Sequence, residues 1–154
     1  MVPNLIGKKA PNFELNSTSG KIVELSKLKS KYIVLYFYPK DDTPGCTLET
    51  KDFNSLLSNF KKVKCEVFGI SKDSLESHKK FKEKYKVKFE LLSDQEKKSI
   101  KAYKTWGKKK FMGKEFMGQI RSTFLIKDNK ILNEWRNVRV KGHAKEVLNF
   151  LKSK

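Results

Sequence analysis

The fold of this chain is decided by the stretch from Tyr32 to Thr47, YIVLYFYPKDDTPGCT. Its first seven residues are apolar or aromatic and do not alternate with polar ones, which is typical of a strand buried on both faces of a mostly parallel sheet. Pro39 ends this strand, because proline has no N–H group to donate to a neighbouring strand. The segment from Lys40 to Gly45 is rich in aspartate, proline and glycine, so we expect a tight turn there.

Cys46 stands where a helix is expected to begin. Thr43 is a natural N-cap, and Pro44 suits the first helical position. The helix is predicted by apolar residues spaced three and four apart, with polar residues between them: Thr50, Phe53, Leu57 and Phe60. A sulfur in the first turn meets free backbone N–H groups and the positive end of the helix dipole, which favour a thiolate. We therefore predict that Cys46 is a nucleophile, although a small cysteine that only packs in the core is the plain alternative.

The rest of the chain predicts a mixed sheet with helices around it. In chain order we expect a hairpin over 13–25, a helical turn over 26–30, a strand over 65–70, a helix from Leu75 to Tyr85, a strand over 89–92, a helix over 93–103, a loop or hairpin over 106–118, a hairpin formed by 122–126 and 130–135, and a last helix after Gly142. The strand–helix–strand order implies parallel pairing through right-handed crossovers. The final strand–strand–helix segment completes the order of a thioredoxin-like fold.

Length, charge and cysteine content set further limits. A chain of 154 residues suits a single domain over residues 1–154. The net charge of +18 attracts polyanions but does not indicate a reaction. The sequence lacks a signal-peptide pattern and a long apolar run, so we expect a cytoplasmic location and no membrane partner. The only cysteines, Cys46 and Cys65, form neither a Cys-x-x-Cys pair nor a metal-ligand cluster with histidine, so we expect no metal and no cofactor.

Three motifs resemble one known family. The pattern Pro39-x-x-x-Thr43-x-x-Cys46 is similar to the active-site signature of the peroxiredoxins, which are thiol peroxidases with a thioredoxin-like fold. The strings YFYPKDDTPGCTLE, KKFMGKEFMGQIRSTFLI and WRNVRVKGHAKEVLNFL resemble the bacterioferritin-comigratory, or Q-type, branch. The likeness covers nearly the whole chain. It implies a three-layer α/β fold with a central mixed sheet, helices on both faces and an N-terminal β-hairpin.

The resemblance also implies roles for four residues around Cys46. Arg121 matches the family's arginine before an S/T-F-L-I strand, and it would stabilise the thiolate and the charge that develops during peroxide attack. Residue types alone would leave it as one of many surface cations. Thr43 would position the peroxide as well as cap the helix, and Pro39 would shape and shield the pocket. Glu49 would give a supporting hydrogen bond, although the helix dipole alone explains an acid there.

The implied reaction is the reduction of hydrogen peroxide or an alkyl hydroperoxide, which leaves Cys46 as a sulfenic acid. Many Q-type relatives carry a resolving cysteine five residues later, where this chain has Lys51. Cys65 is a poor substitute, because its strand would place it roughly 17 to 20 Å from Cys46, whereas a disulfide needs Cα atoms within about 7 Å. We therefore expect a one-cysteine cycle with an external thiol such as thioredoxin or glutaredoxin with glutathione, in a monomer or weak dimer.

Two other functions use the same residues. Lysines over 79–88 and 108–110, with aromatic residues near the second group, are also compatible with a nucleic-acid-associated protein, although a lysine-rich composition without such a partner is the preferred explanation. A thioredoxin-like adaptor without turnover is the other alternative, and it predicts that peroxide leaves Cys46 unmodified.

Four further polar residues are interpreted as structural. His78 and His143 lack the third partner of a Cys-His catalytic arrangement at a recognisable spacing. Asp41 and Asp42 are better explained by the tight turn than by a paired-carboxylate site.

Overall fold

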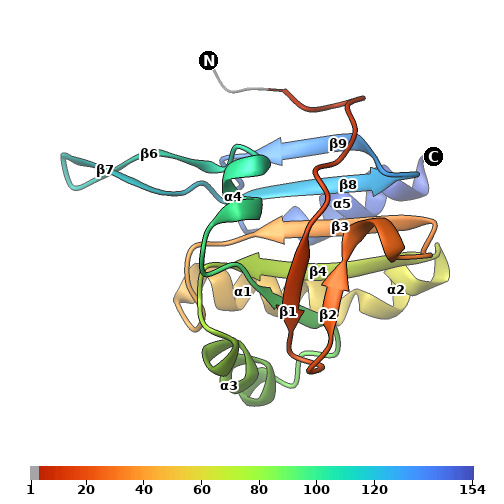
Figure 1. Ribbon diagram of the computed structural model, residues 1–154, viewed down its shortest axis with the longest axis horizontal. Coiled ribbons are helices and arrows are strands. Elements are labelled where there is room, and N and C mark those ends of the chain that lie inside the picture. Colours follow the sequence, from red (N-terminus) through yellow and green to blue (C-terminus); the bar gives the residue numbers. More distant parts are fainter. Residues whose placement is uncertain (1–3) are drawn as a thin grey trace.

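The computed structural model describes residues 4–154, so the first three residues of the predicted domain lie outside it. Its centre is a seven-stranded mixed sheet in the order β2-β1-β5-β4-β3-β8-β9 (Figure 1). The strands are β1 Glu14–Ser17, β2 Ile22–Glu24, β3 Tyr32–Phe37, β4 Cys65–Ser71, β5 Glu90–Ser93, β8 Ser122–Lys127 and β9 Lys130–Arg136. Strands β3, β4 and β5 run parallel, whereas β8 is antiparallel to β3. The predicted mixed sheet is confirmed.

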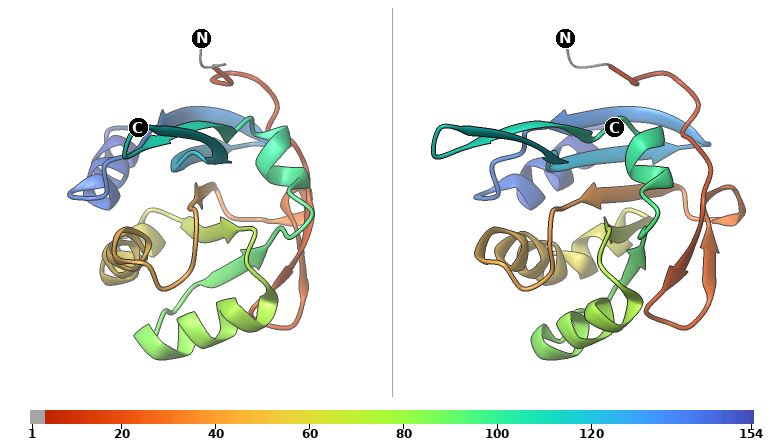
Figure 2. Two further views of the ribbon diagram at one scale, coloured as in Figure 1. Left: turned by 90° about the vertical axis from the view of Figure 1, so that its left-hand side faces the viewer. Right: turned by 60° about the vertical axis from the view of Figure 1, so that its left-hand side comes forward.

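Helices cover both faces of this sheet, as predicted (Figure 2). They are α1 Pro44–Ser55, α2 Leu57–Lys62, α3 Leu75–Tyr85, α4 Lys98–Ala102 and α5 His143–Lys152, with a 3-10 turn, η1, at Leu25–Lys27. Helices α1, α2, α3 and α5 pack on one face. Helix α4, η1 and the N-terminal segment pack on the other. Within residues 4–154, no helix has the length and apolar character needed to cross a bilayer.

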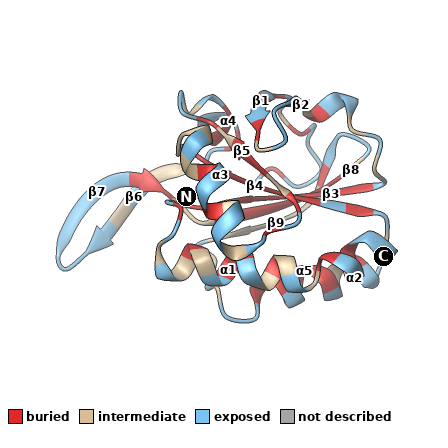
Figure 3. Ribbon diagram, turned by 90° about the horizontal axis from the view of Figure 1, so that it is seen from below, coloured by how far each residue is buried: buried red, intermediate tan, exposed pale blue. Residues whose placement is uncertain are grey.

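Strand β3 is buried along its whole length, as its unbroken apolar sequence predicts (Figure 3). Alternate residues enter the two cores, so that Tyr36 faces the helices α1 and α2 while Phe37 faces α4. Gly69 of β4 leaves room for Tyr36, because a Cβ atom at Gly69 would lie 2.7 Å from the tyrosine oxygen. That oxygen is hydrogen-bonded to Thr50 Oγ1 at 2.9 Å. Helix α1 is therefore fixed directly to the strand that leads into it.

Two helices differ from the prediction. The expected continuous helix after Cys46 is interrupted at Leu56, whose backbone angles of φ −99° and ψ 4° separate α1 from α2. The helix expected over 93–103 is confined to Lys98–Ala102, because Lys97 has a left-handed φ of 61°. Asp94 still caps it, since its Oδ2 accepts a hydrogen bond from Ile100 N at 2.8 Å. Apolar spacing alone does not show such local breaks.

Two of the predicted hairpins form, and the structure shows how each one is placed. The hairpin predicted over 13–25 forms as β1 and β2, and it is part of the main sheet because β1 pairs with β5. Residues 106–118, expected as an irregular loop or hairpin, form a regular hairpin of β6 Trp106–Phe111 and β7 Lys114–Gln119. This hairpin is a separate two-stranded sheet that projects from the body (Figure 1).

Candidate active site

Cys46 occupies the third position of α1, directly after the turn that follows β3. Its residue surface is only 1% exposed. The first backbone hydrogen bond of the helix runs from Thr47 N to Thr43 O at 2.8 Å. The amide of Cys46 therefore belongs to the N–H groups that a helix start leaves without an intrahelical acceptor. It is available as a fixed donor beside the sulfur.

The strand order brings Arg121 to Cys46. Because β8 is antiparallel to β3 and pairs Ser122 with Phe37, the residue before Ser122 lies beside the carboxyl end of β3. There, Arg121 Nη2 donates a hydrogen bond to Cys46 Sγ at 3.4 Å. A guanidinium at this distance places a fixed positive charge and a donor beside the sulfur. The residues alone did not predict this proximity, because it depends on the direction of β8.

Glu49 holds the other side of the same guanidinium. Arg121 Nη1 donates to Glu49 Oε1 at 2.7 Å, and the Glu49 side chain is fully buried. Burial raises the pKa of Glu49 to about 7, although the charge of Arg121 opposes this rise. Burial works to lower the pKa of Arg121, but the negative charges of Glu49 and Cys46 outweigh it and raise that pKa. One guanidinium thus joins a buried carboxyl to the sulfur.

Gly45 is a site residue that the sequence analysis missed. A Cβ atom at this position would lie 3.1 Å from Arg121 Nη2 and 3.9 Å from Val140 Cγ2. Its backbone φ is not positive, so glycine is needed here for space rather than for an unusual conformation. A glycine inside the first helical turn, next to the candidate nucleophile, was the available signal.

Thr43 and Pro39 frame the turn but do not touch the sulfur through any recorded hydrogen bond. Thr43 is the N-cap residue of α1, as predicted, yet its side chain makes no capping hydrogen bond. Its hydroxyl instead donates to Lys40 O at 2.9 Å. The predicted side-chain cap is therefore wrong, because the carbonyl within the turn captures the hydroxyl. Thr43 and Pro39 are both half-buried.

A buried hydrogen-bond network fixes the turn between β3 and α1 to helix α3. Asp41 Oδ1 accepts a hydrogen bond from the Tyr38 hydroxyl at 2.6 Å, and its Oδ2 accepts one from Ser77 Oγ at 2.8 Å. His78 Nδ1 lies 2.7 Å from that Oδ2, and its Nε2 lies 2.9 Å from Leu92 O. Because a carbonyl oxygen only accepts hydrogen bonds, His78 Nε2 is the donor in its contact with Leu92 O. Asp41 and His78 were interpreted as structural, and they lie together in this network.

Asp42 ties the outer side of the turn to α3. Its carboxylate accepts hydrogen bonds from Lys84 Nζ at 2.8 Å and from the Tyr85 hydroxyl at 2.7 Å. These two bonds lower the pKa of Asp42. Asp42 also has a left-handed φ of 57°, which aspartate tolerates better than most residues. The two aspartates thus fix a turn and do not face a common substrate position.

One group of side chains has the composition of a metal site. Potential ligand atoms of Asp41, Asp73 and His78 lie within 4.8 Å of one another. Each is already engaged in hydrogen bonds: Asp73 Oδ2 accepts from Asp41 N at 2.9 Å and from Ser71 Oγ at 2.6 Å. The donor set is thus satisfied internally, and the residues fit a structural network better than a metal ion.

Cys65 lies far from the site. It pairs with Tyr32 at the amino end of β3, whereas Cys46 follows the carboxyl end. Five residue steps at about 3.3 Å separate these ends by roughly 17 Å. Both cysteines are free. Burial raises the pKa of the Cys65 thiol to about 12, so this thiol stays protonated at neutral pH.

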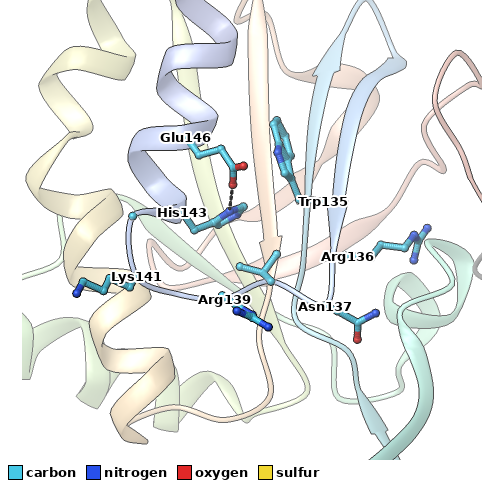
Figure 4. A pocket seen from close by; sticks show the side chains of 9 residues that line it. Trp135, Arg136, Asn137, Arg139, Lys141, His143 and Glu146 are labelled. Atoms are coloured by element: carbon cyan, nitrogen blue, oxygen red, sulfur yellow. Dashed lines mark hydrogen bonds and ion pairs between the residues drawn. The ribbon is translucent and has the colours of Figure 1, made fainter.

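A hollow of about 540 Å³ is lined by the end of β9, the loop that follows it and the start of α5 (Figure 4). The loop also supports the site, since Val138 N donates to Arg121 O at 3.0 Å. On its wall, His143 Nδ1 lies 3.1 Å from Glu146 Oε1, and its Nε2 lies 2.8 Å from Thr123 Oγ1. Burial lowers the pKa of His143. Its partners are those of a structural histidine.

Comparison with known proteins decides the family. The sequence profile described as "AhpC/TSA family" matches residues 6–135. This chain belongs to the AhpC/TSA family. Its relatives there are peroxiredoxins: Peroxiredoxin Bcp of Bacillus subtilis is 51% identical, with 96% of this chain and 94% of that protein covered. The putative peroxiredoxin Bcp of Helicobacter pylori strain 26695 is 47% identical, with coverages of 95% and 97%. The Q-type resemblance is confirmed.

Solved peroxiredoxin structures confirm the fold. Peroxiredoxin Q of Xanthomonas campestris has a TM-score of 0.87 at 39% identity, covering 92% of this chain and 90% of that one. A PrxQ variant of Xylella fastidiosa has a TM-score of 0.90 at 39% identity, with coverages of 96% and 95%. The peroxiredoxin described here therefore has the predicted thioredoxin-like fold.

Proposed function

We propose that this peroxiredoxin reduces hydrogen peroxide and alkyl hydroperoxides through a sulfenic acid on Cys46, as part of antioxidant defence. The observation that carries the assignment to Cys46 is the 3.4 Å hydrogen bond from Arg121 Nη2 to its sulfur at a helix start. One related structure bears a title on the alkyl peroxide reduction activity of the Xanthomonas campestris bacterioferritin comigratory protein. A thiol-dependent peroxidase is what the family supports, and neither a nucleic-acid-associated protein nor an adaptor is favoured by these relatives.

The first half of the reaction consumes the peroxide. The Cys46 thiolate attacks the terminal oxygen, so that an S–O bond forms while the O–O bond breaks. The departing oxygen takes a proton and leaves as water or alcohol, and Cys46 is oxidised to the sulfenic acid. Arg121 and the Cys46 amide stabilise the charge that develops on the oxygens. Thr43 positions the peroxide, and Pro39 shields the pocket.

Glu49 acts through Arg121. Its carboxyl lies 2.7 Å from the guanidinium and fixes its orientation, so that the second terminal nitrogen faces the sulfur. Glu49 is thus proposed as a positioning residue rather than a group that contacts the peroxide.

The second half requires an external thiol. A thiolate attacks the Cys46 sulfenic acid, hydroxide leaves as water after protonation, and a second thiol then releases reduced Cys46 as a disulfide forms between the two reductant sulfurs. Lys51 stands at the position five residues after Cys46, and Cys65 is too distant and too basic to substitute. Thioredoxin and glutaredoxin with glutathione are the proposed reductants. We also propose a single domain over residues 1–154, a cytoplasmic location, and a monomer or weak dimer.

The test is peroxide consumption with each reductant supplied in turn, by wild type, Cys46→Ser and Cys65→Ser. We expect Cys46→Ser to abolish turnover and Cys65→Ser to retain it. Mass spectrometry of the peroxide-treated wild type should show a trapped sulfenic acid on Cys46. A dominant Cys46–Cys65 disulfide would overturn the one-cysteine cycle, and full activity of Cys46→Ser would overturn the assignment of the nucleophile.

A further inference from the structure

The hairpin of β6 and β7, residues 106–119, carries a cluster of exposed apolar side chains. It projects from the end of the sheet at which β3 stops (Figures 1 and 2). Four of the seven large apolar side chains exposed within residues 4–154 belong to it: Phe111 (68%), Met112 (88%), Phe116 (48%) and Met117 (54%). Clusters of exposed apolar side chains on a soluble protein often mark an interaction site.

Basic side chains accompany this apolar tip. The hairpin carries Lys108, Lys109, Lys110 and Lys114 against a single acid, Glu115. Both of its faces combine the two kinds of residue, because the register pairs Lys109 with Phe116 on one face and Lys108 with Met117 on the other. Apolar side chains ringed by lysines are the chemistry of interfacial membrane anchors, in which cations meet anionic headgroups while apolar groups enter the acyl boundary.

From this we propose that the projecting hairpin docks the protein onto an anionic lipid surface, with Phe111 and Met112 inserted. The shape fits this occupant, since strands of six residues extend the tip about 17 Å from its base, whereas interfacial insertion needs only about 5–10 Å. A second copy of the chain is disfavoured by a net charge of +18 on each molecule. Nucleic acid would use the lysines but gives no reason for a methionine at the tip.

The hairpin also connects this surface to the site. Strand β7 ends at Gln119, two residues before Arg121. At its base the side chains of Lys109 and Phe116 lie over Gly118, at 3.0 and 3.3 Å from where a Cβ atom would be. Burial and the charge of Arg121 lower the pKa of Lys109, while the charge of Cys46 opposes this shift. Docking would therefore hold the mouth of the site near the bilayer.

The sequence predicted no membrane partner, because it contains no long apolar run. The tip is instead assembled by a two-residue turn, Met112-Gly113, with left-handed φ values of 52° and 79°. Such a turn brings the ends of two short strands together, so the apolar cluster exists only in the folded hairpin.

The test is co-sedimentation of the full chain with phosphatidylcholine vesicles, with and without phosphatidylglycerol. We expect binding only to the anionic vesicles, weakened by added salt. Phe111→Thr combined with Met112→Asn keeps the strand and turn preferences and should reduce the partition coefficient about tenfold or more. The control is Ile22→Thr, which alters a similarly exposed apolar residue (65%) on β2. This variant should leave the partition coefficient unchanged.

Charge is tested separately. Lys108→Gln with Lys110→Gln should weaken vesicle binding severalfold, whereas Lys61→Gln with Lys62→Gln, on the exposed side of α2, should have little effect. Insertion is read from Phe111→Trp, whose fluorescence should shift to the blue and be quenched by brominated lipid, in contrast to Ile22→Trp. Cys46→Ser should bind as wild type does, so docking is measured independently of the proposed peroxidase reaction.

Several results would overturn the proposal. The first is a lack of binding to anionic vesicles. The second is an equal loss of vesicle binding in the hairpin variants and in their controls, because the vesicles would then be attracted unspecifically by the charge of the whole molecule. A third is a hairpin variant that changes the sedimentation of the free chain but not vesicle binding, since the tip would then contact a second copy. The last is vesicle binding that is unchanged in the Phe111→Thr, Met112→Asn variant while the hairpin binds an acidic protein or an oligonucleotide. That result would exclude lipid as the occupant.

Discussion

Arg121 is half-buried and pairs with the buried Glu49, with Nη1 donating to Oε1 at 2.7 Å. Only one edge of the guanidinium is used by this contact, and the other edge faces Cys46 Sγ at 3.4 Å. The carboxyl of Glu49 therefore sets where the positive charge lies relative to the sulfur. Glu49, which is buried, is therefore proposed to support the geometry of the site through Arg121.

Removing this support should slow the reaction with peroxide. In Glu49→Ala the guanidinium loses its anchor, and a displacement of about 1 Å can reduce the rate by roughly 100-fold. Glu49→Gln keeps an acceptor oxygen at the same position and should recover most of the rate. Stopped-flow measurement of the second-order rate constant with hydrogen peroxide compares them. If both variants react equally slowly, the charge of Glu49 matters and positioning does not.

The same carboxyl should make stability depend on pH. The pKa of Glu49 rises on folding from 4.5 to about 7, so the folded state binds its proton more tightly than the unfolded state does. This contribution to stability is complete below about pH 4.5 and is lost as pH rises through about 7. It is on the order of 3 kcal/mol at most. The free energy of unfolding, measured with urea, should fall less between pH 5 and pH 8 in Glu49→Gln than in wild type. An identical fall in the two proteins would contradict the raised pKa.

Arg121 should not be replaceable by lysine. A lysine keeps the positive charge but cannot donate at once to Glu49 and to the sulfur, because it lacks the planar fork. Loss of one preorganised donor to the developing charge costs about 10²–10³-fold in rate, and we expect Arg121→Lys to fall in this range. Arg139→Lys, an exposed change on the neighbouring loop, is the control. Equal rates for Arg121→Lys and wild type would show that charge alone suffices.

Gly45→Ala should separate activity from stability. The new methyl group would lie 3.1 Å from Arg121 Nη2, so the guanidinium has to shift by a few tenths of an ångström away from the sulfur. Alanine in place of glycine within a helix stabilises it by about 0.5–1 kcal/mol. We therefore expect a slower reaction with peroxide together with an unchanged or higher melting temperature. A variant that loses both stability and activity would point to a packing clash instead.

Substitutions of the two aspartates of the turn should lower the free energy of unfolding by very different amounts. Asp41→Ala removes the partner of Tyr38, Ser77 and His78 inside the protein, and breaking such a buried network costs about 3 kcal/mol. Asp42→Asn loses only solvent-exposed bonds to Lys84 and Tyr85 and keeps a residue that tolerates φ 57°, so its effect should be much smaller. Chemical denaturation of both variants gives the comparison. Equal free energies of unfolding would show that the buried network does not stabilise the fold.

Sequence predicts those parts of this molecule that depend on neighbouring residues. The apolar run ending at Pro39 and the cap position at Thr43 were enough to place Cys46 at a helix start. Arg121 required the direction of β8, a long-range fact that the residues do not contain and that only the family resemblance supplied. Leu56, where the helix breaks, carries no helix-breaking side chain.

The remaining omissions have similar causes. The role of Gly45 follows from space needed by Arg121, a side chain distant in sequence. The Asp41–His78 contact joins a turn to a helix on the next crossover, and apolar periodicity does not report which polar side chains meet. The hairpin of residues 106–119 lacks the usual asparagine–glycine turn and alternates poorly, so it could not be distinguished from a loop.

The pairing of β3 with β8 also determines when the sulfur and the guanidinium meet during folding. Cys46 and Arg121 are separated by 75 positions in the chain, and they meet only after β8 has docked beside β3. A chain emerging from the ribosome therefore exposes its cysteine well before the guanidinium is synthesised. If Cys46 needs Arg121 for its reaction, as proposed, we expect sensitivity to peroxide only in molecules that have finished building their sheet.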